Sequence, residues 1–419
     1  MEIRSISFYT FGCKVNQYET EKLKSLALKE GWEVKPFGNK TDYVFINSCA
    51  VTHIAERKAR RLIRFIRAKF PEAKIILAGC YPERLKSYNF PLDVDILLDN
   101  KEKWEFFNGD ENSFVAPIPT ERTRALVKVQ DGCNNFCSYC IVPFLRGRER
   151  SKPVEVVLWE VENLLNSGYK EIVLTGVRLG AYGKDLGGNI NLANLIRKIL
   201  DYPELKRLRL SSIEPMDFSP DLLDVITEEK VCKHLHIPLQ SGDDEVLRRM
   251  GRRYDTKYFY GLIENIRKRV PDIAIATDII VGFPGEEEDN FKNTLEFAKE
   301  IGFMKIHVFP FSPRPGTKAY TEKPLPPQIV EERKRILMSL SDELWKKYVE
   351  KFIGSRMEVL VENIENGIAE GLTSNYIRVF FKDEKVEKGE FVPVILKNID
   401  KERVLGERVK ECLILNSQL

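Results

Sequence analysis

Short apolar runs of strand length alternate with amphipathic stretches of helical period through residues 1–350, and few fold classes accommodate that order. Strands that alternate with helices form parallel sheets whose faces are covered by the helices. Within residues 1–118 we therefore expect one α/β domain. Its predicted strands are Ile3–Tyr9, Asp42–Ile46 and Lys74–Ala78, and its predicted helices are Gln17–Glu30 and Thr52–Phe70.

Residues 122–350 repeat the alternation six times, with helical patterns such as Val154–Asn166 between the strands. Six such units indicate a partial or full parallel barrel, whose functional site is expected at the carboxyl ends of its strands. The predicted strands are Leu126–Gln130, Glu171–Thr175, Leu205–Leu210, His234–Leu239, Ile273–Ile280 and Lys305–Pro310.

Residues 354–419 have a different pattern, in which short alternating runs are separated by turns rich in Gly, Asn and Lys. This pattern predicts a small five-stranded antiparallel barrel, which the helix Ile329–Phe352 joins to the preceding domain. The predicted strands are Met357–Val361, Ile368–Leu372, Tyr376–Phe381, Phe391–Leu396 and Val404–Val409.

The composition of the 419 residues excludes several classes of protein. The hydrophobic fraction of 43% is ordinary for a globular chain, so wholesale disorder is excluded. No apolar run reaches the ~18 residues of a transmembrane helix, and the N-terminus lacks the apolar stretch of a signal peptide. We therefore expect a cytoplasmic protein with no membrane partner. In a reducing cytosol, clustered cysteines indicate metal or redox sites.

Three cysteines of the first domain each follow a predicted strand: Cys13, Cys49 and Cys80. Because the carboxyl ends of parallel strands meet at one edge of a sheet, these cysteines could converge on one point. They are then candidate metal ligands. The alternative is three buried small side chains, since free cysteine is common in protein cores.

The segment DGCNNFCSYC contains Cys133, Cys137 and Cys140 directly after the first strand of the second domain. Three thiolates in one tight loop can hold three irons of a [4Fe–4S] cluster and leave the fourth open to another ligand. Structural zinc is the alternative, but it usually takes four ligands in paired form. No second cysteine pair or histidine lies nearby in the sequence.

A CxxxCxxC motif after the first strand of a βα barrel resembles the radical S-adenosylmethionine superfamily. The resemblance implies that S-adenosylmethionine binds the open iron and is cleaved to methionine and a 5′-deoxyadenosyl radical. Further stretches at the strand ends resemble the methylthiotransferase subgroup: LTGVRLGAYG, LSSIEP, HIPLQSG, IVGFPGE and FSPRPGTKA. The residues that this likeness implies for cofactor binding are Thr175, Gly176, Arg178, Ser212, Glu214, Gln240, Gly282 and Ser312.

The likeness covers nearly the whole chain and sharpens the expected fold. It implies a partial (β/α)6 radical S-adenosylmethionine barrel in the centre and a TRAM-like RNA-binding barrel at the C-terminal end. It also implies that Cys13, Cys49 and Cys80 bind a second [4Fe–4S] cluster. All six cysteines of the two triads are then catalytic as well as metal-binding.

The stretch TFGCKVNQYETE around Cys13 resembles the MtaB-type branch, which acts on N6-threonylcarbamoyladenosine in tRNA. The branch for isopentenyladenosine usually has GCQMN here, and the branch for a ribosomal protein has GCPKN. The implied reaction adds sulfur and a methyl group at carbon 2 of the adenine next to the anticodon (position 37), and consumes two S-adenosylmethionine molecules. Alternatively, Lys14, Val15 and Asn16 only shape the loop.

The implied partners are the anticodon stem-loop of tRNA, a reduced electron donor such as flavodoxin or ferredoxin, and a sulfur source. The basic stretch Arg57–Lys69 is either a solvated helix face or a phosphate-binding stripe, and Arg146, Arg148 and Arg150 favour contact with substrate or cofactor. Tyr376, Phe380 and Phe381 could stack on RNA bases or belong to the core. The rival functions are methylthiolation of the other two substrates and a non-catalytic, metal-containing RNA-binding protein.

Overall fold

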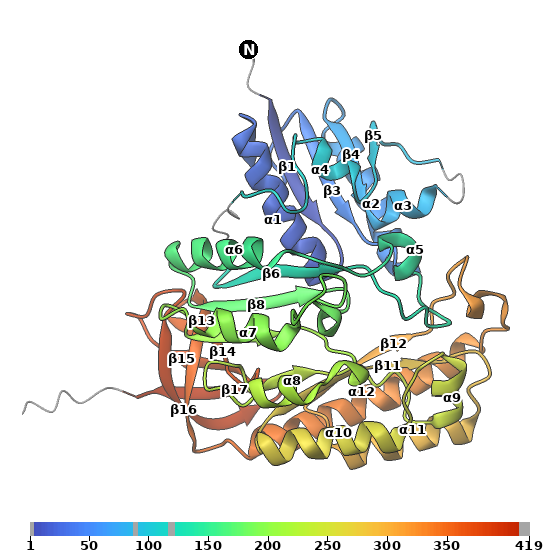
Figure 1. The fold of residues 1–419 in the computed structure, drawn as a ribbon, viewed down its shortest axis with the longest axis vertical. Coiled ribbons are helices and arrows are strands. Elements are labelled where there is room, and N and C mark those ends of the chain that lie inside the picture. The colour runs from blue at the N-terminus through green and yellow to red at the C-terminus, as the bar shows by residue number, and fades with distance from the viewer. Residues whose placement is uncertain (1–3, 87–90, 116–121, 410–419) are drawn as a thin grey trace, which may run out of the picture.

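The computed structural model describes residues 4–86, 91–115 and 122–409. Ile3, where the first predicted strand begins, and residue 118, where the first domain was predicted to end, lie outside these ranges. A parallel sheet from the N-terminal part lies against the central sheets, and a small barrel from the C-terminal part adjoins the central region at another side (Figure 1). The predicted α/β class is confirmed.

The N-terminal sheet is parallel throughout and has the order β2-β1-β3-β4-β5. Its two outer strands were not predicted, because each is only three residues long. The strands are β1 (Ser5–Thr10), β2 (Glu33–Lys35), β3 (Tyr43–Ser48), β4 (Lys74–Gly79) and β5 (Ile96–Leu98).

Helices cover both faces of this sheet. Successive side chains of a strand point to opposite faces, so neighbouring residues pack against different helices. Phe45 of β3 belongs to one apolar cluster together with Leu23 of α1 (Lys14–Lys29), while Val44 belongs to another together with Ile63 of α2 (His53–Lys69). Two short helices complete this part, α3 (Cys80–Leu85) and α4 (Glu102–Glu105).

The central region contains two sheets that continue one another. The first has the order β7-β6-β8-β9 and the second the order β10-β11-β12, and an isolated bridge joins Leu208 of β9 to Val231, just before β10. Among the described residues no pairing joins β12 back to the first sheet, so the six predicted strands form a partial barrel. The strands are β6 (Arg124–Asp131), β7 (Arg150–Ser151), β8 (Glu171–Gly176), β9 (Arg207–Leu210), β10 (His234–His236), β11 (Ala274–Val281) and β12 (Lys305–Pro310).

Helices cover the outer side of this partial barrel, and the longest, α12, continues from it toward the C-terminal barrel (Figure 1). The helices are α5 (Val142–Arg146), α6 (Val154–Asn166), α7 (Leu192–Leu200), α8 (Pro220–Val225), α9 (Asp244–Arg249), α10 (Thr256–Arg269), α11 (Glu288–Ile301) and α12 (Pro327–Glu350). Within the described part of the chain, no helix combines the length and apolar character needed to span a membrane.

The C-terminal strands form a closed barrel in the order β13-β14-β15-β17-β16. Four of its pairings are antiparallel as predicted, but β15 and β17 run parallel, with Val379 opposite Val404. A ring of five strands cannot alternate direction all the way round, so one parallel pair is unavoidable. The strands are β13 (Arg356–Glu365), β14 (Ile368–Thr373), β15 (Arg378–Lys382), β16 (Phe391–Asp400) and β17 (Arg403–Arg408).

Two arginines of β9 fix this barrel to the central region. Arg207 donates to the Leu372 carbonyl over 3.1 Å, and Arg209 donates to the Thr373 carbonyl over 3.2 Å. Arg209 is fully buried, and Glu171 balances its charge at 2.7 Å. A buried arginine held by a carboxylate and backbone carbonyls leaves little freedom for the barrel to move, so the loop before β15 has a defined place beside the central strands.

Candidate active site

The three scattered cysteines follow three neighbouring strands of the N-terminal sheet. Cys13 precedes α1 directly after β1, Cys49 follows β3, and Cys80 begins α3 at the end of β4. All three line one cavity of about 1310 Å³. The strand order brings them to the same sheet edge, as the sequence predicted.

Asn16 ties two of the cysteine loops together. Its amide nitrogen donates to the Phe11 carbonyl over 2.8 Å and to the Ser48 carbonyl over 3.0 Å, so it joins the loop before Cys13 to the loop before Cys49. Val15 is buried. These two residues of the GCKVN stretch therefore have the loop-shaping role that the sequence left open, whereas Lys14 lines the cavity.

The thiols of this group influence one another. Burial and the neighbouring Cys80 and Cys13 thiols together raise the pKa of Cys49 to about 12, while the Arg146 cation acts in the opposite direction. Burial also raises the pKa of Cys80. Three soft sulfur donors at one sheet edge suit an iron–sulfur cluster.

The second triad is held by its own loop. The Cys133 amide donates to the Gly147 carbonyl over 3.1 Å, and the Cys140 amide donates to the Cys137 carbonyl over 3.0 Å. Gly132 has a φ of +71°, and a Cβ there would lie 2.0 Å from the Arg148 carbonyl oxygen, so only glycine fits. Burial, reinforced by the Cys137 thiol, raises the pKa of Cys140 to about 12.

Two of the residues predicted to bind cofactor lie beside this loop. Arg178 makes a two-point contact with Asp217, at 2.9 and 2.8 Å, and a third bond of 2.7 Å to Glu149. Glu214 forms an ion pair with Arg252, which also donates to the Cys137 sulfur over 3.3 Å. In this state Arg178 and Glu214 support the loop and its surroundings.

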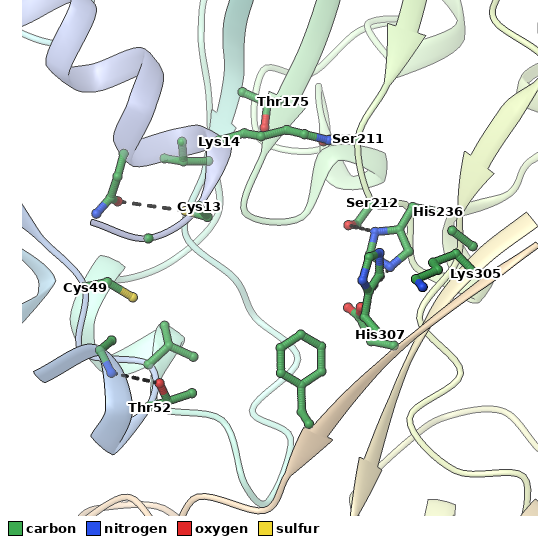
Figure 2. Close-up of a pocket in the computed structure, with 18 of the residues that line it drawn as sticks. Cys13, Lys14, Cys49, Thr52, Thr175, Ser211, Ser212, His236, Lys305 and His307 are labelled. Carbon is green, nitrogen blue, oxygen red and sulfur yellow. Dashed lines mark hydrogen bonds and ion pairs between the residues drawn. The ribbon is translucent and has the colours of Figure 1, made fainter. Parts of the chain in front are cut away.

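The cavity extends from the scattered cysteines to the carboxyl ends of the central strands. Thr175, Gly176 and Ser212, three more of the predicted residues, lie on its wall. Figure 2 shows Cys13 and Cys49 on one side of this space and Ser212, His236 and His307 on the other. The C-terminal barrel contributes Tyr376, whose ring stacks on His234 with centroids 4.4 Å apart.

Three polar side chains form a connected row on the far wall. Ser212 Oγ lies 2.7 Å from His236 Nδ1, and His236 Nε2 lies 2.9 Å from the Asp278 carboxylate. The His307 ring contacts His236 edge to face, and burial together with the His236 charge lowers the pKa of His307. Sequence reasoning missed His307; its signal is a histidine within an otherwise mostly apolar predicted strand.

The remaining predicted residues lie outside the cavity wall. Gln240 has a φ of +70° and connects to β11 through its backbone, and the Gly282 amide donates to Glu286 over 2.8 Å. Ser312 accepts a bond from the His53 amide over 3.2 Å, and Arg314 nearby donates to the Ala50 carbonyl over 2.7 Å. The loop after β12 thus closes against the segment that carries Cys49.

The structure places Arg146, which was predicted to contact substrate or cofactor, on the cavity wall, with its guanidinium enclosed by protein groups. Its guanidinium is buried and bonds to Glu19 at 2.9 Å, to Asp131 at 3.0 Å and to Asn16 at 2.6 Å. These bonds join the last residue of α5 to α1 and to the end of β6. Arg146 therefore joins the two regions and places one positive charge near Cys80 and Cys49.

Comparison with known proteins agrees with this arrangement. The model of the Radical SAM superfamily matches residues 127–298, and a model described as uncharacterized protein family UPF0004 matches residues 5–97. The "Threonylcarbamoyladenosine tRNA methylthiotransferase MtaB" of Thermotoga maritima is 39% identical over 97% of each chain, and that of Bacillus subtilis is 37% identical over 94% of each. The chain belongs to the radical SAM methylthiotransferase family.

Relatives named for a different tRNA substrate are also similar to this chain. A "tRNA-2-methylthio-N(6)-dimethylallyladenosine synthase" of Clostridium botulinum is 33% identical over 96% of each chain. Among solved structures, the radical S-adenosylmethionine methyltransferase TsrM of Kitasatospora setae superposes with a TM-score of 0.55 at 15% identity, over 76% of this chain and 77% of that one. That likeness concerns the fold alone. The family uses [4Fe–4S] clusters and S-adenosylmethionine, and the two thiol triads suit two such clusters.

Proposed function

We propose that this enzyme converts N6-threonylcarbamoyladenosine next to the anticodon of a tRNA, at position 37, to its 2-methylthio derivative. The observation that supports this most strongly is one large cavity. The N-terminal cysteines, the carboxyl ends of the central strands and the loop before β15 all line it. A site built by three regions can hold a sulfur-carrying group and a nucleoside side by side. The names of the most similar relatives support the threonylcarbamoyl substrate.

Each triad has a distinct part in this proposal. Cys133, Cys137 and Cys140 hold one cluster, and Cys13, Cys49 and Cys80 hold the other. When bound, the clusters and S-adenosylmethionine supply the reducing electron, the radical initiator, the sulfur and the methyl group. The eight residues at strand ends, from Thr175 to Ser312, are proposed to bind cofactor, with Thr175, Gly176 and Ser212 nearest the substrate space.

The chain's own residues have three tasks in the site. The apolar wall, which includes Val51, Ile54 and Phe309, excludes water from the reacting base. The row of Ser212, His236 and Asp278 offers hydrogen bonds to the polar edge of a purine. Arg146 stabilises negative charge near Cys49 and Cys80.

The exposed basic face of α2 supports an RNA substrate. Arg57, Lys58, Arg61 and Arg64 are exposed, and Lys58 also lines the cavity. Phosphates attract such a face, and a face that leads into the cavity orients the bound strand. In the C-terminal barrel Phe381 is buried in the core, so Tyr376 is the better candidate of the predicted aromatics for RNA contact.

We further propose three domains, at residues 1–118, 122–350 and 354–419, the last being a TRAM-like RNA-binding barrel. The reaction requires a reduced electron donor such as flavodoxin or ferredoxin and a separate sulfur source. Because mature tRNA is the substrate, we propose that the enzyme works in the cytoplasm.

The test is methylthio transfer by anaerobically reconstituted protein. Wild-type protein, S-adenosylmethionine, a reductant and sulfide are incubated with tRNA that carries N6-threonylcarbamoyladenosine, and the digested nucleosides are analysed by mass spectrometry. We expect the 2-methylthio derivative. Parallel reactions contain tRNA with the dimethylallyl modification and ribosomal proteins; a product only in one of those would refute the proposed substrate.

A further inference from the structure

One cation on the cavity wall has no counter-charge. Among lysines and arginines that line the cavity, Arg146, Lys305 and Arg378 each form ion pairs with carboxylates. Lys58, Lys346 and Lys401 are exposed to solvent. Lys14 differs from both groups: it lies half-buried in the cavity wall, and among the described residues it has no hydrogen-bond or ion-pair partner.

The groups around Lys14 do not supply the missing negative charge. No carboxylate is among the groups that act most strongly on its ammonium group: Arg124 and Arg209 are cations, while Tyr376 and Cys13 offer only a hydroxyl and a thiol. The two arginines' own carboxylates, Glu362 and Glu171, are bonded to them at 2.7 Å each. A partly buried charge without a partner costs free energy, so an anionic ligand at this point would be bound favourably.

The position of Lys14 also matches the geometry of a modified adenine. Lys14 follows Cys13 and begins α1, and its side chain extends into the space between the cysteines and the Ser212 side of the cavity (Figure 2). Carbon 2 and carbon 6 of adenine flank N1, so a substituent on N6 lies at the same edge of the base as carbon 2. A base whose carbon 2 faces the Cys13 group therefore presents its N6 substituent close by.

The two kinds of substrate named for the relatives differ in charge at that substituent. A threonylcarbamoyl group ends in an α-carboxylate, which is ionised at neutral pH, whereas a dimethylallyl group carries neither charge nor hydrogen-bonding atoms. We infer that Lys14 Nζ binds the carboxylate of the threonylcarbamoyl group and thereby selects this substrate over an N6-dimethylallyl adenosine. This inference rests on the proposed function.

The experiment compares three anticodon stem-loop RNAs on reconstituted wild-type protein and variants. The RNAs carry N6-threonylcarbamoyladenosine, its carboxyl methyl ester, or N6-dimethylallyladenosine at the same position. RNA binding is measured by fluorescence anisotropy, and methylthio transfer by mass spectrometry. For wild type we expect the free acid to bind more tightly than the ester. In Lys14→Met, affinity for the acid should fall roughly 10- to 100-fold, to the level of the ester.

Two controls separate this contact from other effects. Lys14→Arg keeps the charge and should keep the preference for the acid, and all variants must contain as much iron as wild type because Lys14 adjoins Cys13. Lys58→Met removes an exposed lysine of the same cavity and should weaken the binding of all three RNAs equally. Equal losses on acid and ester in Lys14→Met would assign Lys14 to a phosphate or another anion and overturn the inference.

Failure of the proposed function gives a different result. If wild type prefers the acid to the ester but transfers no methylthio group to it, the function is wrong and the carboxylate site stands. If wild type modifies the threonylcarbamoyl RNA but Lys14→Met still distinguishes acid from ester, the function stands and the role of Lys14 is wrong.

Discussion

The two cysteine triads present similar donors but are built in different ways. Cys133, Cys137 and Cys140 lie within one loop, where the Cys133 and Cys140 amides bond to carbonyls between residues 137 and 147, although Met250 and Ala319 also bond to Ser138. Cys13, Cys49 and Cys80 come from three strand ends, separated by 36 and 31 residues of sequence. The first triad therefore depends on local conformation, and the second on the register and order of a sheet and on contacts between two regions.

Replacing either triad should have the largest effect and should affect that triad alone. The combined Cys133/Cys137/Cys140→Ala variant should lose S-adenosylmethionine cleavage, and its iron should fall from about eight to about four per chain. The Cys13/Cys49/Cys80→Ala variant should keep cleavage, lose a similar amount of iron and form no methylthio product. Iron, acid-labile sulfide and 5′-deoxyadenosine are measured. Loss of all iron in both variants would contradict independent triads.

A single added methyl group should damage only the local triad. In Gly132→Ala the new Cβ meets the Arg148 carbonyl, so the loop cannot close and about half of the iron should be lost. Gly31→Ala is the matched control, since Gly31 also has a positive φ, of +80°, but no atom lies within 4 Å of its would-be Cβ. Equal iron losses in the two variants would show that backbone strain rather than the contact is responsible.

A buried carboxylate outside the cavity, Glu19, should stabilise the folded region that carries the scattered triad. Burial by itself raises the pKa of Glu19, but Arg146, Lys103 and Lys128 outweigh it and hold the pKa well below its usual range. Glu19→Gln leaves three buried cations short of charge and should destabilise the apo protein by about 3–5 kcal/mol. Urea unfolding measures the effect, with the exposed Glu30→Gln at the end of the same helix as control.

The same carboxylate gives a pH dependence with a definite sign. Because the folded pKa of Glu19 is depressed, the native state binds fewer protons, and this stabilisation is fully present above the unfolded pKa of about 4.3. It is lost as the pH falls from there toward the folded value. The urea midpoint of wild type should drop in that window more than that of Glu19→Gln; parallel curves would exclude this role.

The smallest effect is expected at Asn16. Asn16→Ala leaves the Phe11 and Ser48 carbonyls without their donor and removes one acceptor of Arg146, which should cost about 1–3 kcal/mol. Iron of the scattered triad should pass faster to a chelator, while S-adenosylmethionine cleavage stays unchanged. Asn108→Ala, which removes an exposed contact to Glu30, is the control. A faster loss from the loop triad would contradict the assigned role.

Elements that depend on local sequence patterns could be predicted, whereas those that depend on contacts between distant segments could not. Six strands of the central region, all but the two-residue β7, and the five runs of the C-terminal barrel were visible in the sequence, since each depends on a local apolar pattern. The three-residue strands β2 and β5 were not, because they exist only by pairing at sheet edges. His307 and the buried setting of Arg146 also could not be predicted, since their partners are distant in the sequence.

The sequence by itself determined the alternation of elements, the loop triad and the family likeness, because cysteine spacing and apolar periodicity depend only on residues close together in the chain. Only the tertiary structure decided that Arg146 is enclosed by carboxylates, that β15 and β17 run parallel, and that Lys14 faces the cavity without a counter-charge. Charge balance and strand direction depend on which distant segments meet, and that is settled by the packing of the whole chain.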